Sequence, residues 1–193
     1  MTKISTKGFL FNVERCIGCH ACEVACKNEN KTAPGVQWRR VTEGENGTYH
    51  SISCNHCSSP ECFRVCPENA YIKRRDGIVL IDSNRCAGCN TCVQACPYHA
   101  PQFDLHQNRT TKCNYCIDRQ REGLPPACVV ACPSGALVNI DLKHLPLEST
   151  VPTVPGFPDI RITKPSIRFF PQKGKKRYWL KEEKSESTKN TDL

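Results

Sequence analysis

Sixteen cysteines, which fall into four groups of four, constrain this sequence more than any other feature. The groups are Cys16, Cys19, Cys22 and Cys26; Cys54, Cys57, Cys62 and Cys66; Cys86, Cys89, Cys92 and Cys96; and Cys113, Cys116, Cys128 and Cys132. The 193 residues include only one Met, two Trp and seven Phe, which are few for an ordinary apolar core. We therefore expect disulfides, structural zinc or iron-sulfur clusters to hold the interior together.

The spacing inside the groups favours iron-sulfur clusters. In a C-x2-C-x2-C-x3-C run followed by proline, three thiolates bind one [4Fe-4S] cluster and the fourth binds a second cluster. The third group is an unbroken copy that ends in Pro97. The second and fourth groups keep the last step, with Pro67 and Pro133, but have longer central loops, and the first group has Lys27 in place of proline. The repetition predicts four [4Fe-4S] clusters.

Zinc and disulfides are the weaker alternatives. Tetrahedral zinc uses paired C-x2-C elements separated by a dozen or more residues, and only the fourth group, with its gap between Cys116 and Cys128, looks like such a site by itself. In a disulfide framework, cysteines this close in sequence would have to pair elsewhere, and nothing in the sequence marks a secreted domain.

The rule for the fourth cysteine also predicts which groups share clusters. Cys66 and Cys86 are twenty positions apart, so the second and third groups are expected to exchange their fourth ligands. The first and fourth groups then pair across the segment between them. The predicted ligand sets are Cys16, Cys19, Cys22 and Cys132 (set A); Cys26, Cys113, Cys116 and Cys128 (set B); Cys54, Cys57, Cys62 and Cys96 (set C); and Cys66, Cys86, Cys89 and Cys92 (set D).

This pairing predicts an α+β fold of two ferredoxin-like units, one inserted in the other, with short strands and helices around four iron-sulfur clusters. The outer unit comprises residues 1–49 and 101–145, and the inserted unit comprises residues 50–100. Strands are expected over 8–13, 36–42, 48–53 and 70–81, the last broken by a hairpin turn at Asp76-Gly77, and helical turns over 23–28 and 93–95.

Residues 146–193 are predicted to form an extended C-terminal tail, because the cysteines stop and prolines multiply after Ile140. The tail is either a disordered terminus or an arm that contacts a partner subunit, and the apolar residues within it favour the arm. These residues are Ile160, Ile162, Ile167, Phe169, Phe170, Tyr178 and Trp179.

The formal charge of +8 would ordinarily suggest a nucleic acid or a membrane surface as partner. Four oxidised clusters with their cysteines carry roughly two negative charges each, so we expect the basic residues to balance the clusters and no nucleic acid to bind.

No apolar run approaches the roughly 18 residues of a membrane span, and the N-terminus has no apolar stretch of signal-peptide length. We expect neither a span nor an export signal in this chain.

Several other residues lie beside the cysteine groups. With four complete ligand sets no ligand is missing, so the histidines are expected near the clusters or at the surface, and the tyrosines as packing. These are His20, His56, His99 and His106, with Tyr98 and Tyr115. Basic residues near the groups are expected to raise reduction potentials by stabilising the more negative, reduced cluster. They include Lys27, Arg64, Arg85 and Lys112.

Over residues 8–140 the sequence resembles a known family, the four-cluster iron-sulfur subunits of the dimethyl sulfoxide reductase family of molybdoenzymes. The resemblance is carried by CNHCSSPECFRVCPENA at 54–70, DGIVLID at 76–82, CPYHAPQFD at 96–104 and KCNYCIDRQREGLPPACVVACPSGAL at 112–137. In relatives such as the nitrate reductase beta subunit, Trp replaces one group-three cysteine and one cluster is [3Fe-4S]. Here all sixteen positions are Cys, which agrees with four cubanes.

The resemblance implies a non-catalytic electron-transfer subunit, and no residues here are arranged like a nucleophile or general base. Its implied partners are a molybdopterin-containing catalytic subunit and an integral membrane anchor that oxidises quinol. The implied location is a membrane-associated complex, at the periplasmic face by co-export with the catalytic subunit or at the cytoplasmic face. The alternatives are an electron wire of a formate dehydrogenase or hydrogenase type complex and a free-standing polyferredoxin.

Overall fold

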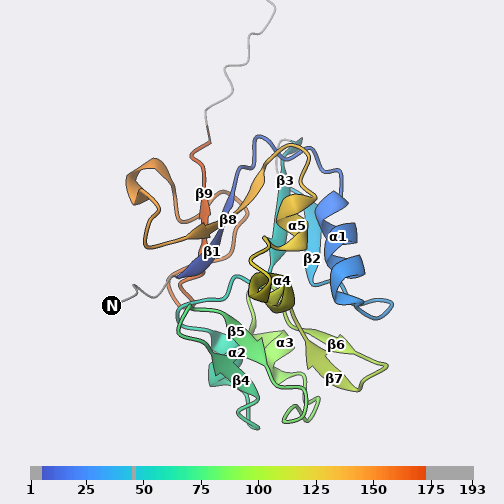
Figure 1. Cartoon of the computed structure of the whole chain (residues 1–193). Coiled ribbons are helices and arrows are strands. Elements are labelled where there is room, and N and C mark those ends of the chain that lie inside the picture. Colours follow the sequence, from blue (N-terminus) through green and yellow to red (C-terminus); the bar gives the residue numbers. More distant parts are fainter. Residues whose placement is uncertain (1–5, 45–46, 173–193) are drawn as a thin grey trace, which may run out of the picture.

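Short strands and short helices alternate with long loops in the computed structural model of the chain, which describes residues 6–44 and 47–172 (Figure 1). The strands are β1 (Lys7–Phe11), β2 (Arg39–Glu43), β3 (Tyr49–Ser53), β4 (Tyr71–Lys73), β5 (Val79–Ile81), β6 (Gln102–Asp104), β7 (Arg109–Thr111), β8 (Leu137–Asp141) and β9 (Ile167–Phe169). The helices are α1 (Ala21–Asn30), α2 (Glu61–Arg64), α3 (Thr91–Ala95), α4 (Ile117–Arg121), α5 (Ala127–Val130) and the 3-10 turn η2 (Leu147–Ser149). The fold is therefore mixed, with both helices and strands, as the sequence predicts.

A three-stranded sheet joins the beginning of the chain to segments far along it. Strand β1 lies in the middle, antiparallel to β8 and parallel to β9. In this register Phe9 lies opposite both Asn139 and Ile167. Residues more than a hundred positions apart thus share one sheet, and Figure 1 shows the three strands side by side.

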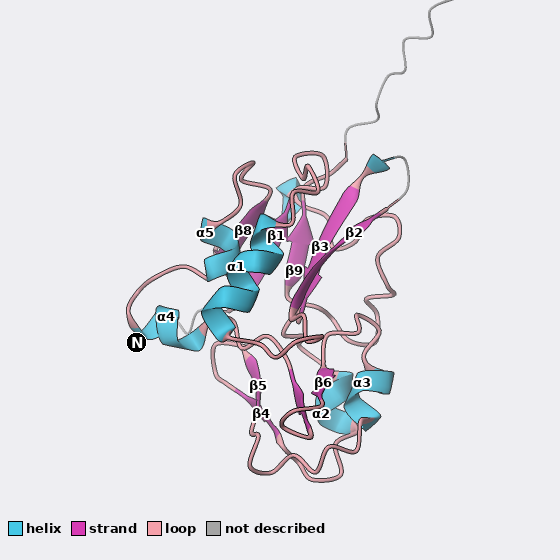
Figure 2. Ribbon diagram, turned by 90° about the vertical axis from the view of Figure 1, so that its right-hand side faces the viewer, coloured by secondary structure: helices cyan, strands magenta, loops and turns pink. Residues whose placement is uncertain are grey.

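Helix α1 and the β2–β3 hairpin complete this half of the molecule. Helix α1 packs against α5 and against β2, so the helix that carries the last two cysteines of the first group lies beside the fourth group. Figures 1 and 2 both show α1 and α5 adjacent, on the side of the molecule that carries β2 and β3.

The residues between these segments build the other half. Strands β4 and β5 form one antiparallel hairpin, β6 and β7 form another, and helix α2 packs against α3. Both views place these elements together at the end of the molecule away from β1, β8 and β9 (Figures 1 and 2). None of the helices within 6–44 and 47–172 combines the length and apolar character that crossing a bilayer would require.

The structure confirms most expected elements and shifts some of their ends. The hairpin turn at Asp76-Gly77 is confirmed, with Gly77 at φ 86° between β4 and β5. Helix α1 is longer than the expected turn over 23–28 and ends before Lys31, which is left-handed. Strand β2 begins three residues later than expected, because Val36 donates its N–H to the Ala33 carbonyl and closes a turn there.

The described part of the tail packs on its own chain. Strand β9 joins β1, and Val151 forms a bridge with Phe169. Ile167 and Phe169 are buried, whereas Ile162 is exposed. Apolar residues that alternate along β9 thus cover the sheet. Tyr178 and Trp179, on which the prediction of a partner contact also rests, lie outside the described residues.

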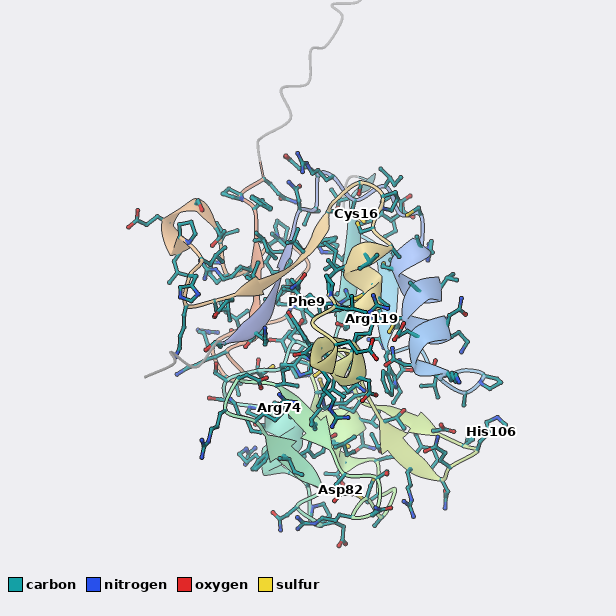
Figure 3. The ribbon with its side chains drawn as sticks, in the orientation of Figure 1. Phe9, Cys16, Arg74, Asp82, His106 and Arg119 are labelled. Carbon is teal, nitrogen blue, oxygen red and sulfur yellow. The ribbon has the colours of Figure 1, made fainter. Side chains whose placement is uncertain are left out.

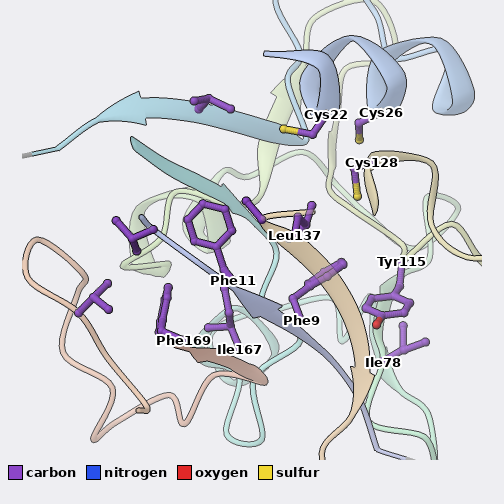
Figure 4. Packing of buried hydrophobic residues seen from close by; sticks show 14 residues of the cluster. Phe9, Phe11, Cys22, Cys26, Ile78, Tyr115, Cys128, Leu137, Ile167 and Phe169 are labelled. Atoms are coloured by element: carbon purple, nitrogen blue, oxygen red, sulfur yellow. The ribbon is translucent and has the colours of Figure 1, made fainter. Parts of the chain in front are cut away.

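Aromatic side chains and cysteine sulfurs share the largest apolar cluster. Phe9, Phe11, Leu137 and Phe169 pack with Tyr115, and Cys22, Cys26 and Cys128 lie in the same cluster. Figure 4 shows the rings between β1, β8 and β9, with the three cysteines toward α1 and α5. The apolar interior of this half therefore continues directly into the sulfur-lined region.

Phe169→Ala should lower the stability of the protein, because its ring is 1% exposed and packs on Phe11 at a centroid distance of 6.4 Å. We expect a loss of about 3–5 kcal/mol in the free energy of unfolding, read as a lower melting temperature. The control Phe170→Ala removes the neighbouring ring, which is 37% exposed, and should cost about 0.5 kcal/mol or less. Equal losses for the two variants would contradict the packing of β9 on β1.

Candidate iron-sulfur cluster sites

The four cysteines of set A line one hollow of about 300 Å³. Three of them come from the loop before α1 and its first turn, and Cys132 comes from the loop after α5. Burial raises the pKa of the Cys16 thiol, and the charges of Cys22, Cys132 and Cys19 raise it further. The structure thus brings together residues separated by more than a hundred positions.

The four cysteines of set C line a second hollow, of about 360 Å³. Cys54, Cys57 and Cys62 come from the loop before α2 and from α2 itself, and Cys96 follows α3. Burial raises the pKa of Cys57 to about 12, together with the charges of Cys54 and Cys96. Sulfurs of two cysteine groups therefore line one space, as predicted for set C.

Set B combines Cys26 of α1 and Cys128 of α5, two helices that pack together, with Cys113 and Cys116 of the loop before α4. Burial raises the pKa of the Cys26 thiol, and the charges of Cys113, Cys128 and Cys116 raise it further. Figure 4 shows Cys26 and Cys128 next to each other, with Cys22 turned to another side of α1. The neighbours Cys22 and Cys26 on one helix therefore face different sets.

The structure brings two cysteines of set D together. Cys66 and Cys92 belong to one apolar cluster with Tyr71 and Val79. Cys86 is half-buried and Cys89 exposed, and the Cys89 sulfur accepts the hydroxyl of Thr91 at 3.4 Å. That all four bind one cluster remains a prediction.

All sixteen thiols are free, so the disulfide alternative is wrong. Within the described ranges, no three Cys, His, Asp or Glu side chains converge closely enough to hold one metal ion. In sets A and C the sulfurs instead surround a hollow, and this arrangement suits a cluster of several iron atoms.

The loops of the four groups share one backbone feature. The residue before the second cysteine is left-handed in every group: Gly18 at φ 68°, His56 at 44°, Gly88 at 73° and Tyr115 at 62°. Two groups use glycine, for which this conformation carries no steric penalty, and two hold bulky aromatic residues there. The loops are thus repeats in geometry as well as in sequence.

Comparisons with known proteins agree with this geometry. The model of the 4Fe-4S dicluster domain family matches residues 46–142, and that of the 4Fe-4S binding domain family matches residues 16–30. The sequence is 40% identical over 180 residues to the B chain of the anaerobic dimethyl sulfoxide reductase of Escherichia coli K12, an alignment that covers 83% of this chain and 86% of that one. This protein belongs to the B-chain family of anaerobic dimethyl sulfoxide reductases.

Two further relatives show how widely the family extends. The probable anaerobic dimethyl sulfoxide reductase chain YnfG of Escherichia coli K12 is 40% identical over 176 residues, covering 83% of this chain and 86% of YnfG. The B subunit of the tetrathionate reductase of Salmonella typhimurium is 43% identical over 144 residues, covering 69% of this chain and 57% of the relative.

Of the four basic residues expected beside the clusters of this B chain, only Lys112 is buried. Its ammonium group donates to the carbonyls of Val79 and Cys113, and its charge acts on Cys54. Lys27 instead donates to loop carbonyls at the end of α1, Arg64 pairs with Glu61 at the surface, and Arg85 is exposed. Proximity in sequence therefore identified Lys112 correctly, but not the other basic group that acts on the sulfurs.

Arg39 is a second buried basic residue, which the sequence did not single out. Burial would lower its pKa, but the charges of Cys128, Cys113 and Cys22 raise it above the usual value. Arg39 stands beside Arg40 in an alternating strand, and one of the two had to face inward. The sequence could not tell which.

The histidines divide as expected between the surface and the interior. His20, His99 and His106 are exposed, and His106 lies at the tip of the β6–β7 hairpin (Figure 3). His56 is buried, and its ring contacts Tyr115 edge to face at 5.5 Å. Tyr115 and Tyr98 are both buried, which confirms that they are packing residues. The Tyr115 hydroxyl donates to the Gly8 carbonyl, and the Tyr98 hydroxyl shares a hydrogen bond with the Thr163 hydroxyl.

His56 also affects the chemistry of Cys54. Burial would raise the pKa of the Cys54 thiol, but the charges of His56 and Lys112 and a hydrogen bond from His56 lower it to about 5. Burial would lower the pKa of the His56 imidazole, but the charge of Cys54 raises it to about 9. The Val79 N–H donates to Nδ1 of His56 at 3.1 Å. This hydrogen bond opposes the rise in the pKa of His56, because an imidazolium has no lone pair at Nδ1.

The tail closes the set C hollow, which the sequence did not predict. Ser58 and Ser59 donate their backbone N–H groups to Lys164 and Thr163, and Ser166 donates to Asn55. Thr163 also lines the hollow and shares a 2.7 Å hydrogen bond with the Tyr98 hydroxyl. Residues 163–166 therefore tie the second cysteine loop to the sheet.

Gly18→Ala should disrupt set A, because a Cβ there would lie 2.7 Å from the Tyr49 ring as well as being strained at φ 68°. Gly35→Ala is the matched control: its φ is 81°, but nothing lies within 4 Å of the added Cβ. Both variants carry a backbone penalty of roughly 1–2 kcal/mol. We expect Gly18→Ala alone to lower the iron content per chain, measured after anaerobic purification. An equal loss in both variants would show that contact with Tyr49 is unimportant.

Proposed function

We propose that this protein is an electron-transfer subunit that holds four [4Fe-4S] clusters on the ligand sets A to D. The observation that carries the proposal is that two hollows are each lined by three cysteines of one group and one cysteine of another. When bound, each cubane can take up and release one electron. The protein supplies the ligands, the burial and the charges that set the potentials.

The layout of the chain supports two nested ferredoxin-like units. The first and fourth groups adjoin through α1 and α5 and through the β1–β8 pairing, and the second and third groups adjoin through α2 and α3. Residues 1–49 and 101–145 would form the outer unit and residues 50–100 the inserted one. The contact of His56 with Tyr115 lies where a second-group loop meets a fourth-group loop.

The position of the sets suits a relay between two surfaces. Cys16 of set A lies near one end of the molecule, and Asp82, four residues before Cys86 of set D, lies at the opposite end (Figure 3). Cys19 of set A and Cys89 of set D are exposed, whereas all four cysteines of set C are buried. Electrons would therefore enter near one end and leave near the other, while the buried cysteines between the two ends are shielded from water.

The names of the relatives suggest the partners. The relatives are components of dimethyl sulfoxide and tetrathionate reductases, so we propose that this protein docks on a molybdopterin-containing catalytic subunit that performs the reduction. The electrons would come from a quinol-oxidising membrane anchor, and the complex would lie at the periplasmic face of the membrane. A formate dehydrogenase or hydrogenase type wire is the related alternative, with the electron flow reversed.

Iron and acid-labile sulfide analysis of the anaerobically purified protein, with EPR of the reduced form, tests the cluster count. Four cubanes predict about sixteen irons per chain. A colourless protein with zinc in place of iron would contradict the proposal. Co-purification with a molybdenum-containing polypeptide separates a docked subunit from a free-standing polyferredoxin, which would purify alone.

Cys132→Ser tests the exchange of fourth ligands between groups. We expect it to alter the cluster of Cys16, Cys19 and Cys22, seen as loss or conversion of one EPR signal while the other three remain. Ser134→Ala is the control, because this hydroxyl lies 3.7 Å from the Cys132 sulfur but is not a proposed ligand. If Cys132→Ser and Cys128→Ser alter the same signal, Cys132 serves its own group and the nested layout is wrong.

A further inference from the structure

The guanidinium of Arg39 is buried between the cysteines of sets A and B. The side chain is 2% exposed, and Cζ lies 4.8 Å above the ring of Phe9. Nη1 donates to the Ser51 hydroxyl at 3.0 Å and Nη2 donates to the Ser53 hydroxyl at 2.9 Å. Phe9 lies near the centre of the molecule in Figure 3, so this charge is deep in the fold.

Arg39 has no acidic partner. None of the ion pairs formed by the described residues includes it, and its Nε, which is also buried, has no hydrogen-bond partner among them. Among the described residues it donates to neutral oxygens of Ser51 and Ser53, and its side chain also forms a hydrogen bond with the Cys128 sulfur. A buried charge without a counter-charge is strongly unfavourable, so this guanidinium requires an anion nearby.

The charges of cysteine sulfurs from two sets act on Arg39. Cys128, Cys113 and Cys26 belong to set B and Cys22 belongs to set A, and the charge of Cys128 acts most strongly. Set A is also reached through Ser51. The Ser51 hydroxyl accepts from Arg39 and lies 3.3 Å from the Cys22 sulfur, to which it can therefore donate its own proton.

We propose that Arg39 is a positioning residue that serves as the internal counter-ion of the clusters on sets B and A and raises their reduction potentials. The inference rests on the proposed ligand sets. Reduction adds one negative charge to a cluster, and a fixed cation beside it stabilises the reduced form more than the oxidised form. Because Arg39 is buried, salt in the solvent screens this effect little.

The size of the effect should follow the contacts. Set B, whose Cys128 and Cys113 act most strongly on Arg39, should respond most, and set A, reached through Cys22 and the Ser51 hydroxyl, should respond less. Lys112 occupies the corresponding place beside set C, where its charge acts on Cys54, Cys62 and Cys96. Removing Arg39 should therefore leave the potentials of sets C and D nearly unchanged.

The test is a potentiometric titration of the anaerobically purified protein, with dithionite as reductant and EPR as readout, on the parent and on Arg39→Gln. Arg121→Gln is the charge-matched control, since it removes the same charge from a side chain that is 73% exposed and paired with Asp118. We expect one midpoint potential to fall clearly in Arg39→Gln, a second to fall less and two to stay in place. Arg121→Gln should change none.

Four unshifted midpoints in Arg39→Gln with full iron content would overturn the inference while leaving the proposed clusters intact. A parent protein without iron would instead defeat the proposed function. If Arg39→Gln fails to assemble, Arg39→Lys decides: restored iron content and EPR signals would support the requirement for charge. Iron loss as large as in Arg39→Gln would show that only the shape of arginine matters and would overturn the inference.

Discussion

The convergence of sulfurs from distant stretches of the chain around common hollows is the constraint on which the rest of the structure depends. Cys132 reaches the hollow of Cys16, Cys19 and Cys22, and Cys96 reaches that of Cys54, Cys57 and Cys62. Short helices, one three-stranded sheet and three two-stranded sheets connect these loops in the described part of the chain. A fold with so little regular structure needs ligand bonds across the chain to supply what a larger apolar core would otherwise provide.

The placement of positive charge inside the protein follows from the same constraint. The protein carries a formal charge of +8. Arg39 and Lys112 are buried, and neither is in any of the ion pairs formed by residues 6–44 and 47–172. Such groups are tolerated where anions lie next to them, and clusters with cysteine ligands are anionic. Arg39 and Lys112 therefore connect the excess of basic residues to specific sites. The same two residues would distinguish the potentials of neighbouring clusters along the relay.

The sequence predicted local features well because cysteine spacing and turn residues act at short range. The Asp76-Gly77 hairpin and the helical turns expected over 23–28 and 93–95, which lie within α1 and α3, follow from a few adjacent residues. Long-range features were harder. The return of Ile167 and Phe169 to β1 depends on pairing over more than 150 positions, which no local pattern encodes. For the same reason Arg39 could not be told from Arg40, since which one faces inward depends on the register of β2 with β3.

The most direct test of the account is to locate iron in a crystal of the anaerobically prepared protein by anomalous scattering at the iron edge. The account predicts four separate iron clusters, each contacted by three cysteines of one group and one of another, with Cys132 on the cluster of Cys16, Cys19 and Cys22. Clusters bound entirely by cysteines of a single group, or hollows in sets A and C without iron, would contradict it.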